Sequence, residues 1–380
     1  MTQSNFFDAI SVADMEKVHS AVIGWMLSDK CEAFGQNIRS KLLQQIFGDM
    51  ESPEVYDHIE AFIEWNSIDI LIITTEGKGD EEKKKCWVIE NKIKSSQHSN
   101  QLDRYVDTIC DEEQYQSYDK AYCFLTLIEE PPRCSKDVKW VNTRYQDLLR
   151  YFCSVSRLNS NKDGIILKEY FSCIKKLNDS LNDFLDHYTD YENVFNDGSL
   201  RKTEKLKKWA NLDTICPNGK FYRYISDNGL ETIFQKCFLA TIVPKTSFKD
   251  LSYSISETRG SALVDFQYES IDEGRVKIGI QFQNGSFKVQ ILQEESSGQD
   301  FYEKWYNKTK EFIPQLKGNG EVIWTVNPSK NKAKPYLSIS TQRDSEWFKG
   351  KIIDKWKDAY DACSNAAKEF IAKYKNGFFK

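Results

Sequence analysis

Ile68-Asp-Ile-Leu-Ile-Ile-Thr-Thr75 and Cys86-Trp-Val-Ile-Glu-Asn-Lys92 are two apolar, strand-forming stretches, and each of them contains charged side chains. An ionised carboxylate such as Asp69 costs several kcal/mol to bury unless a partner, for example a metal ion, compensates it. Successive side chains of a strand point to opposite faces, so Glu90 and Lys92 share one face and Asn91 points to the other. The two stretches therefore predict that Asp69, Glu90 and Lys92 converge on one face of two neighbouring strands.

The segments around these strands predict a small α/β unit. Apolar residues recur at helical spacing from Ser11 to Leu27, and Asn66-Ser67 separates two strand patterns as a tight hairpin turn does. Gln101 and Tyr105 are four residues apart, so they lie on one face of the helix expected there. The expected elements are helices at 11–27, 34–47 and 99–110, strands at 58–65, 68–75, 86–92 and 121–127, a solvated loop at 76–85, and an end of the unit at Pro131-Pro132.

An Asp, a Glu-x-Lys and a Gln-x-x-x-Tyr in this order resemble the PD-(D/E)XK, or restriction-endonuclease-like, nuclease superfamily. The pattern is most similar to the bacterial branch that carries Gln-x-x-x-Tyr after the Glu-x-Lys strand. The resemblance covers only the N-terminal part of the chain. It implies a core that runs helix, three antiparallel strands, helix, strand, and an activity that hydrolyses phosphodiester bonds with a divalent metal ion.

The charged residues are suited to that chemistry. Asp69 and Glu90 are hard oxygen ligands of the kind that Mg²⁺ and Mn²⁺ prefer. In this family's geometry, the backbone carbonyl of Asn91 is expected as a further ligand. Lys92 is the expected partner of the attacking water, which it would orient or, with a lowered pKa beside the metal, help to deprotonate.

The resemblance also assigns roles to three residues on helices. It implies that Gln101 lies near the metal and the water, and that Tyr105 lies near the substrate phosphate. The branch usually has a Glu in the first helix that can join the metal shell, and Glu16 is at that place. His19, three residues later, shares a helix face with Glu16.

Each of these residues also has an ordinary structural interpretation. A chain rich in Glu and Lys contains Glu-x-Lys triplets by chance, but the apolar Trp87-Val88-Ile89 before this triplet needs a buried strand. Tyr105 would equally pack in the core beneath an amphipathic helix, and His19 would be a half-buried group with satisfied hydrogen bonds. Glu60 and Glu64 are weaker candidates for the site, with solvent exposure as the ordinary expectation. His98 and Arg104 would contact the DNA backbone or, equally, be plain surface residues.

The C-terminal half predicts helices followed by a second α+β domain. Asn284-Gly285 between two strand patterns is a strong two-residue hairpin signal. The expected elements are helices at 144–155, 165–177, 181–195, 200–210, 300–316 and 345–374, and strands at 262–269, 276–282, 287–292, 322–326 and 336–340. The four tryptophans Trp305, Trp324, Trp347 and Trp356 are expected in the core rather than stacked on bases.

The composition sets limits on the class of protein. The formal net charge of −5 argues against a surface coated in positive charge, although a nuclease needs only a local basic stripe. Charge runs are usually solvated faces. The runs that would contact DNA are 83–85, 201–209, 330–334 and the Lys-rich final helix.

The ten cysteines are scattered, with no Cys-x-x-Cys pair, which predicts reduced thiols and no zinc site. No secretory signal is visible, and no apolar segment approaches the roughly 20 residues that span a bilayer. We therefore expect a soluble, cytoplasmic protein that makes no membrane contact.

The sequence thus predicts an α/β protein with a restriction-endonuclease-like core at 1–155, a mixed central sheet flanked by helices. A helical connector is expected at 156–215, and a second α+β domain for substrate or partner recognition at 216–380. The expected activity is Mg²⁺- or Mn²⁺-dependent hydrolysis of DNA, and the resemblance implies a restriction or anti-phage defence effector.

Two alternatives belong to other classes of protein. One is a PD-(D/E)XK fold that has lost its chemistry and only binds nucleic acid, and the other is a protein-interaction scaffold. The intact Asp69, Glu90, Lys92 and Gln101 favour the enzyme. Cutting both strands would favour a homodimer, and a defence role would add a partner protein. The choice between DNA and RNA, single and double strands, and internal and terminal cleavage stays open.

Overall fold

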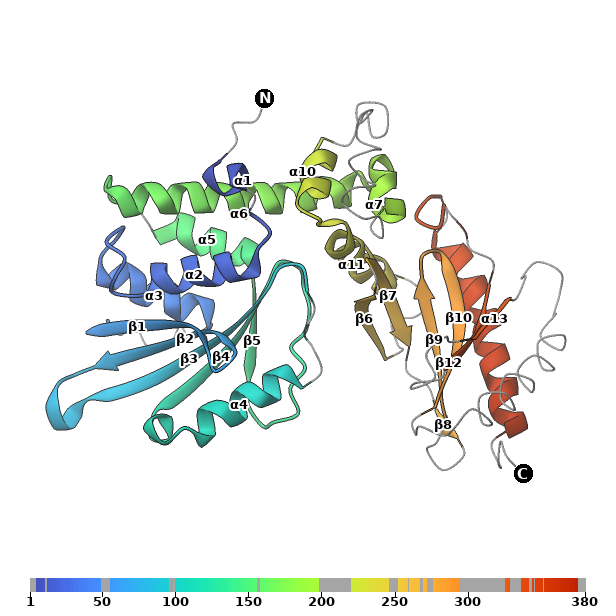
Figure 1. Cartoon of the computed structure of the whole chain (residues 1–380), viewed down its shortest axis with the longest axis horizontal. Helices are drawn as coiled ribbons and strands as arrows, with labels where there is room; N and C mark the ends of the chain where they lie inside the picture. Colours follow the sequence, from blue (N-terminus) through green and yellow to red (C-terminus); the bar gives the residue numbers. More distant parts are fainter. Residues whose placement is uncertain are drawn as a thin grey trace. The chain divides into compact units, whose positions relative to one another are not determined.

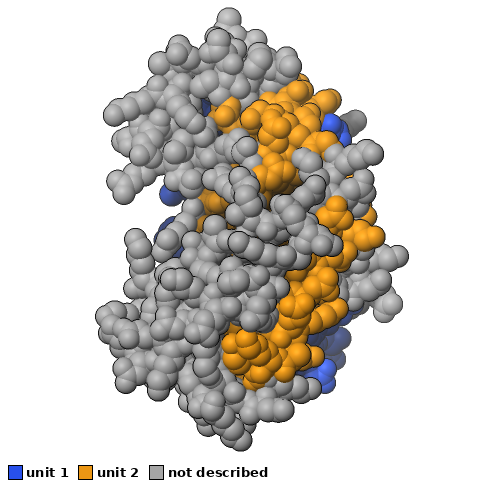
Figure 2. All heavy atoms as spheres, turned by 90° about the vertical axis from the view of Figure 1, so that its right-hand side faces the viewer, with its two compact units in different colours: residues 1–186, 223–233 blue, residues 187–222, 234–380 orange. Residues whose placement is uncertain are grey.

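The chain folds into two compact units, each described by itself (Figure 2). Unit 1 consists of Met1–Asp186 and Arg223–Ile233, and unit 2 of His187–Tyr222 and Phe234–Lys380. The computed structural model describes residues 5–10, 12–48, 55–95, 97, 100–155, 158–197, 220–245, 252–258, 260–266, 269–271, 276–293, 325–328, 336–341, 344, 346–350 and 352–374.

Unit 1 is built on a five-stranded mixed sheet in the order β1-β2-β3-β4-β5 (Figure 1). The strands are β1 (His58–Trp65), β2 (Ile68–Glu76), β3 (Lys83–Lys92), β4 (Asp119–Thr126) and β5 (Trp140–Arg144). The first three are antiparallel, whereas β4 is parallel to β3 and β5 is parallel to β4. This is the restriction-endonuclease-like architecture that the sequence predicts, a mixed central sheet flanked by helices.

The turn between β1 and β2 fixes the register of the strand that carries Asp69. Asn66 and Ser67 have φ angles of 47° and 70°, the left-handed conformation that two-residue hairpin turns require. Trp65 consequently pairs with Ile68, and Ile63 with Ile70. The predicted hairpin is confirmed.

Helices cover both faces of this sheet (Figure 1). One face carries α2, which contacts β1, β2 and β3, together with α3 and α5. The opposite face carries α4, whose buried Leu102, Tyr105, Val106 and Ile109 pack with Leu71, Val88 and Phe124. The helices are α1 (Phe6–Ala9), α2 (Glu16–Leu27), α3 (Gln36–Ile46), α4 (Gln101–Asp111), α5 (Tyr145–Val155) and α6 (Lys162–Asp186).

Several predicted boundaries in unit 1 are wrong. The first helix begins at Glu16 rather than at Ser11, and β3 begins at Lys83, inside the predicted loop. The core does not end at Pro131-Pro132, because β5 follows and pairs with β4. The two helices predicted at 165–177 and 181–195 are one helix, α6, up to Asp186, followed by the 3₁₀ turn Tyr188–Tyr191 and α7 (Glu192–Asp197).

Unit 1 is completed by a segment distant in sequence. Arg223–Ile233, which includes most of α10 (Tyr222–Asp227), belongs to this unit. Ile225 and Leu230 are fully buried, and the Lys176 ammonium of α6 lies 4.4 Å from the Tyr224 ring centroid. The helical stretch predicted as a connector, 156–215, is therefore divided between the units, with α6 in unit 1.

Unit 2 contains a seven-stranded antiparallel sheet and a long helix. The sheet runs β11-β12-β10-β9-β7-β6, with β8 paired to β9, and α13 packs on β9 and β10. The elements are α11 (Glu231–Ile242, which starts in unit 1), β6 (Tyr253–Thr258), β7 (Ser261–Phe266), β8 (Ser270–Ile271), β9 (Val276–Gln283), β10 (Ser286–Gln293), β11 (Thr325–Pro328), β12 (Tyr336–Ser340) and α13 (Ile352–Tyr374).

The predicted hairpin at Asn284-Gly285 joins β9 to β10, and both residues have positive φ angles, 50° and 75°. Trp347 and Trp356 are buried, as expected, around Phe282. Some predictions fall outside the described residues. They concern Trp305, Trp324, the basic runs at 201–209 and 330–334, and the helices at 200–210 and 300–316.

Two further expectations concern the whole chain. Among the described helices, none is long and apolar enough to cross a membrane. The nine cysteines in the described ranges are free thiols.

Candidate active site

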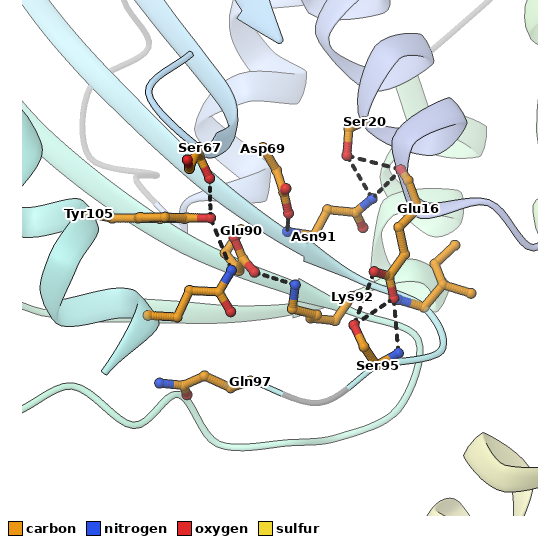
Figure 3. A network of polar contacts seen from close by, with 12 residues as sticks. Glu16, Ser20, Ser67, Asp69, Glu90, Asn91, Lys92, Ser95, Gln97 and Tyr105 are labelled. Atoms are coloured by element: carbon orange, nitrogen blue, oxygen red, sulfur yellow. Dashed lines mark hydrogen bonds and ion pairs between the residues drawn. The ribbon is translucent and has the colours of Figure 1, made fainter. Parts of the chain in front are cut away.

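Asp69 and Glu90 meet at the centre of the unit 1 sheet because of the β2–β3 register. Ile70 pairs with Ile89, so the next position brings Asp69 level with Glu90. The backbone N–H of Asn91 donates to Asp69 Oδ2 at 2.8 Å, which ties the Asp69 side chain to β3 (Figure 3). Both carboxylates thus lie on the α4 side of the sheet, at the carboxyl end of β3.

Glu90 is a buried carboxylate with little to satisfy it. None of its side chain is exposed (0%), and it forms an ion pair with Lys92. Lys92 is the positively charged partner of Glu90, and it also carries the charge that balances Asp69. Burial and the nearby Asp69 charge raise the pKa of Glu90 to about 8, although Lys92 opposes the shift.

Lys92 is the positive partner of this cluster. Its side chain is only 8% exposed. Burial by itself would lower the pKa of the Lys92 ammonium, but the charges of Glu90, Asp69 and Glu16 raise it above its ordinary value. In this arrangement Lys92 is a cation, which favours the role of orienting a water over that of removing its proton.

Asp69 is the half-buried member of the cluster. Burial raises its pKa above the ordinary value, while the Asn91 N–H and the Lys92 charge act in the opposite direction. Asp69 and Glu90 therefore form a pair of carboxylates that is under-neutralised by the protein alone. Such a pair gains from a bound cation.

Gln101 and Tyr105 approach the cluster from α4, as expected from their spacing. The Gln101 amide donates from Nε2 to the Tyr105 hydroxyl at 3.0 Å, and that hydroxyl donates to the Ser67 carbonyl in the β1–β2 turn. Burial and the charges of Glu90 and Asp69 raise the pKa of Tyr105, so it stays protonated. Tyr105 is also part of the apolar core, as its ordinary structural interpretation predicts.

Asn91 points away from the carboxylates, as strand alternation predicts. Its side chain is fully buried on the α2 side. Its Nδ2 donates to the Ser20 hydroxyl and the Glu16 carbonyl, at 3.0 and 3.1 Å, and its Oδ1 accepts from the Tyr145 hydroxyl at 2.7 Å. The Asn91 backbone is therefore held beside Asp69 and Glu90.

Glu16 is the first residue of α2, and its carboxylate accepts hydrogen bonds from the turn that follows β3. Its Oε1 accepts from the N–H groups of Ile93, Lys94 and Ser95, each at 2.9 Å, and the Ser95 hydroxyl is 3.0 Å from both carboxylate oxygens. Burial tends to raise the pKa of Glu16, but these hydrogen bonds and the Lys92 charge hold it below its ordinary value. Its carboxylate is thus engaged by protein donors.

The expected metal ligands fit a cation in part. Across the described ranges, no three His, Cys, Asp or Glu side chains are grouped as a metal site. The structure brings together Asp69, Glu90 and the Asn91 peptide but not Glu16. Two carboxylates with a carbonyl and water are a sufficient set for Mg²⁺ or Mn²⁺, and a cation would supply the positive charge that Lys92 alone does not give to Asp69 and Glu90.

The weaker candidates for the site are engaged elsewhere or lie at the surface. His19 is buried, with Nε2 2.9 Å from the Ala13 carbonyl and Nδ1 3.2 Å from the Tyr170 hydroxyl, and burial lowers its pKa to about 4. Glu60 and Arg104 are exposed, Glu64 is paired with Lys17, and His98 lies outside the described residues. In the basic run, Lys84 pairs with Glu82 and Lys85 lies over the Trp87 ring.

Sequence reasoning missed the partners of these residues. Ser20 and Tyr145 hold the Asn91 side chain by hydrogen bonds, and Ser95 does the same for Glu16. The Ser67 carbonyl accepts a hydrogen bond from the Tyr105 hydroxyl. Tyr145 is 54 positions from Asn91. No local spacing links such residues, so only the three-dimensional arrangement could find them.

Comparison with known proteins gives one match. Residues 4–172 match the model of the PD-(D/E)XK nuclease superfamily. The matched stretch contains β1 to β5 and every site residue named above. No curated protein and no solved structure matches the chain.

Proposed function

Residues 4–172 belong to the PD-(D/E)XK nuclease superfamily, and from this membership and the site geometry we propose that the protein is a metal-dependent nuclease that hydrolyses DNA. Membership alone implies a phosphodiesterase that acts on nucleic acid. The metal requirement and the choice of DNA are the parts that we add. The resemblance of the sequence to restriction and defence nucleases supports a defence role in the same way.

The observation that carries the proposal is the state of Glu90. A fully buried carboxylate that shares a single lysine with a second carboxylate lacks a full counter-charge and is costly to keep. A protein that used this strand only as a scaffold would gain stability from an apolar residue or a glutamine at this position. A cation at the site supplies the missing interaction and accounts for the carboxylate.

Asp69, Glu90 and the Asn91 carbonyl would hold the metal. A bound Mg²⁺ or Mn²⁺ would supply Lewis-acid polarisation of the phosphate and activation of a water molecule. Lys92 would orient the attacking water and stabilise negative charge on the phosphoryl oxygens. Tyr105 and Gln101, fixed to the β1–β2 turn through Ser67, would orient the phosphate from the α4 side.

The first test compares cleavage by wild type and Glu90→Gln with Mg²⁺ or Mn²⁺. Linear duplex DNA, circular plasmid, single-stranded DNA and single-stranded RNA serve as substrates. We expect wild-type cleavage of DNA and a loss of more than about a hundredfold in Glu90→Gln, since even the outer partners of metal ligands are worth that much. Plasmid linearisation would identify an endonuclease, and digestion from ends an exonuclease.

Glu60→Gln is the matched control, because it makes the same chemical change at an exposed position of the neighbouring strand β1. It should retain wild-type activity. Cleavage of RNA alone would correct the substrate. A wild type that binds DNA but cuts no substrate with either metal would refute the proposal in favour of a non-catalytic nucleic-acid-binding protein.

A further inference from the structure

The Asn91 side chain has no role in the chemistry above, yet both ends of its amide are held by hydrogen bonds. It is fully buried, and both Nδ2 hydrogens have acceptors, one on Ser20 and one on the Glu16 carbonyl. Its Oδ1 accepts from the Tyr145 hydroxyl at 2.7 Å. Figure 3 shows this amide turned toward Ser20, away from Glu90 and Lys92.

The backbone of the same residue is part of the site. Its N–H donates to Asp69, and its carbonyl is the expected third metal ligand. Rotation of the Asn91 peptide would move this carbonyl and displace Asp69 and Glu90 at once. Because the buried side chain is fixed by three hydrogen bonds, such a rotation would leave buried polar groups unpaired.

The protons in this layer can be assigned from the acceptors. The Ala13 carbonyl only accepts, so His19 Nε2 carries the ring proton, and Nδ1 of the neutral ring accepts from the Tyr170 hydroxyl. The Tyr170 hydroxyl therefore donates to His19, whereas the Tyr145 hydroxyl donates to Asn91. The two tyrosines are both fully buried and interact with each other, and it is the Tyr145 hydroxyl that donates to Asn91.

We propose that Tyr145 and Ser20 are positioning residues of the metal site, which act through the Asn91 side chain. From α5 and α2 they hold the Asn91 peptide in the orientation in which its carbonyl, Asp69 and Glu90 can bind one divalent cation. This inference rests on the proposed function. It assigns a role in metal affinity to α5, which contributes no residue to the reaction itself.

The test is the Mn²⁺ affinity of Tyr145→Phe, measured by titration calorimetry on the full chain. We expect binding about tenfold weaker than in wild type, the usual effect of losing a partner of a metal ligand. The Mn²⁺ concentration for half-maximal cleavage should rise by the same factor, and the rate at saturating Mn²⁺ should stay near that of wild type. Ser20→Ala should show a smaller shift in the same direction.

Tyr224→Phe is the matched control, because it removes the same atom from a buried tyrosine of unit 1 whose hydroxyl has no hydrogen-bond partner among the described residues. Its Mn²⁺ affinity should equal that of wild type, whatever the loss of stability. Unchanged affinity in both Tyr145→Phe and Ser20→Ala, or an equal loss in Tyr224→Phe, would overturn the inference while leaving the nuclease proposal standing. A wild type that binds no Mn²⁺ and behaves like Glu90→Gln would overturn both.

Discussion

Glu90 is the residue at which stability and function oppose each other most directly. Its burial raises the pKa of the carboxyl to about 8, against 4.5 in an exposed glutamate. The folded state therefore holds the proton at pH values where the unfolded chain has released it. Stability is unaffected below about pH 4.5, falls as the pH rises toward 8, and carries the full cost above that value.

Glu90→Gln should remove this pH dependence. We expect the stability of the metal-free variant, relative to wild type, to increase by roughly 2 kcal/mol between about pH 5 and about pH 8. Chemical denaturation in the presence of a chelator, at several pH values, measures this difference. Parallel stability curves for the two proteins would show that Glu90 is not the titrating group.

The residues of the site divide into those that the sequence reveals and those that it does not. Asp69, Glu90 and Lys92 stand out because a strand alternates faces and charged groups interrupt an apolar run. Ser20 and Tyr145 carry no such contrast, since a serine in a helix and a tyrosine after a strand are ordinary. Their role depends on hydrogen bonds to Asn91, which is 71 positions from Ser20 and 54 positions from Tyr145.

Among the elements, α2 is tied to the end of β3 by a single side chain. Glu16 binds the three successive N–H groups that follow Lys92, which ends the strand and fixes the direction of the turn. The helix therefore positions Lys92 indirectly, through the three residues that follow it. The contacts at this turn are those of an anion bound by several successive backbone N–H donors.

Glu16→Ala should free this turn. Three buried N–H groups would lose their acceptor, so we expect a loss of about 2–4 kcal/mol in the free energy of unfolding and faster amide exchange at residues 93–95. Because the folded pKa of Glu16 lies below 4.5, its contribution is present above that pH and is lost as the pH falls through the lowered value.

Glu64→Ala serves as the control for Glu16→Ala, because its pairing with Lys17 is exposed and should contribute less than about 1 kcal/mol. Hydrogen–deuterium exchange separates the two variants. Unchanged protection at 93–95 in Glu16→Ala would mean that the turn is held by other groups.

The element boundaries show where local patterns mislead. β5 escaped prediction because Trp140–Arg144 is short and contains Asn142, Thr143 and Arg144; its pairing with β4 comes from the core around it. α6 was expected to break near Asn178 and Ser180, which are weak helix formers. Both side chains instead donate to carbonyls one turn back, and Leu177, Leu181 and Phe184 form one buried face.

The whole molecule consists of two units that each contain a hydrophobic core. In unit 1 the core lies between the mixed sheet and its helices, and in unit 2 it lies under α13. Separate cores imply separate unfolding transitions. The two transitions can be assigned with one ligand and one substitution.

Gly285→Ala should lower only the transition of unit 2. Gly285 has a φ of 75°, and a Cβ there would lie 2.0 Å from the Asp344 carbonyl oxygen and 2.7 Å from Trp347, so we expect a loss of roughly 3 kcal/mol. Mn²⁺ should raise only the transition of unit 1, by mass action on the folded state. Calorimetry measures both shifts, and a single transition that responds to both changes would contradict the separation.

The return of Arg223–Ile233 to unit 1 has a consequence for synthesis on the ribosome. The chain leaves the ribosome from its N-terminus, so α6 must wait for Tyr224, Ile225 and Leu230 before its last face is covered. By then the first part of unit 2, from His187 onward, has also been made. Unit 1 is therefore finished only after translation has passed residue 233, and a nascent chain stopped at residue 172 would leave the ribosome without the complete fold of this unit.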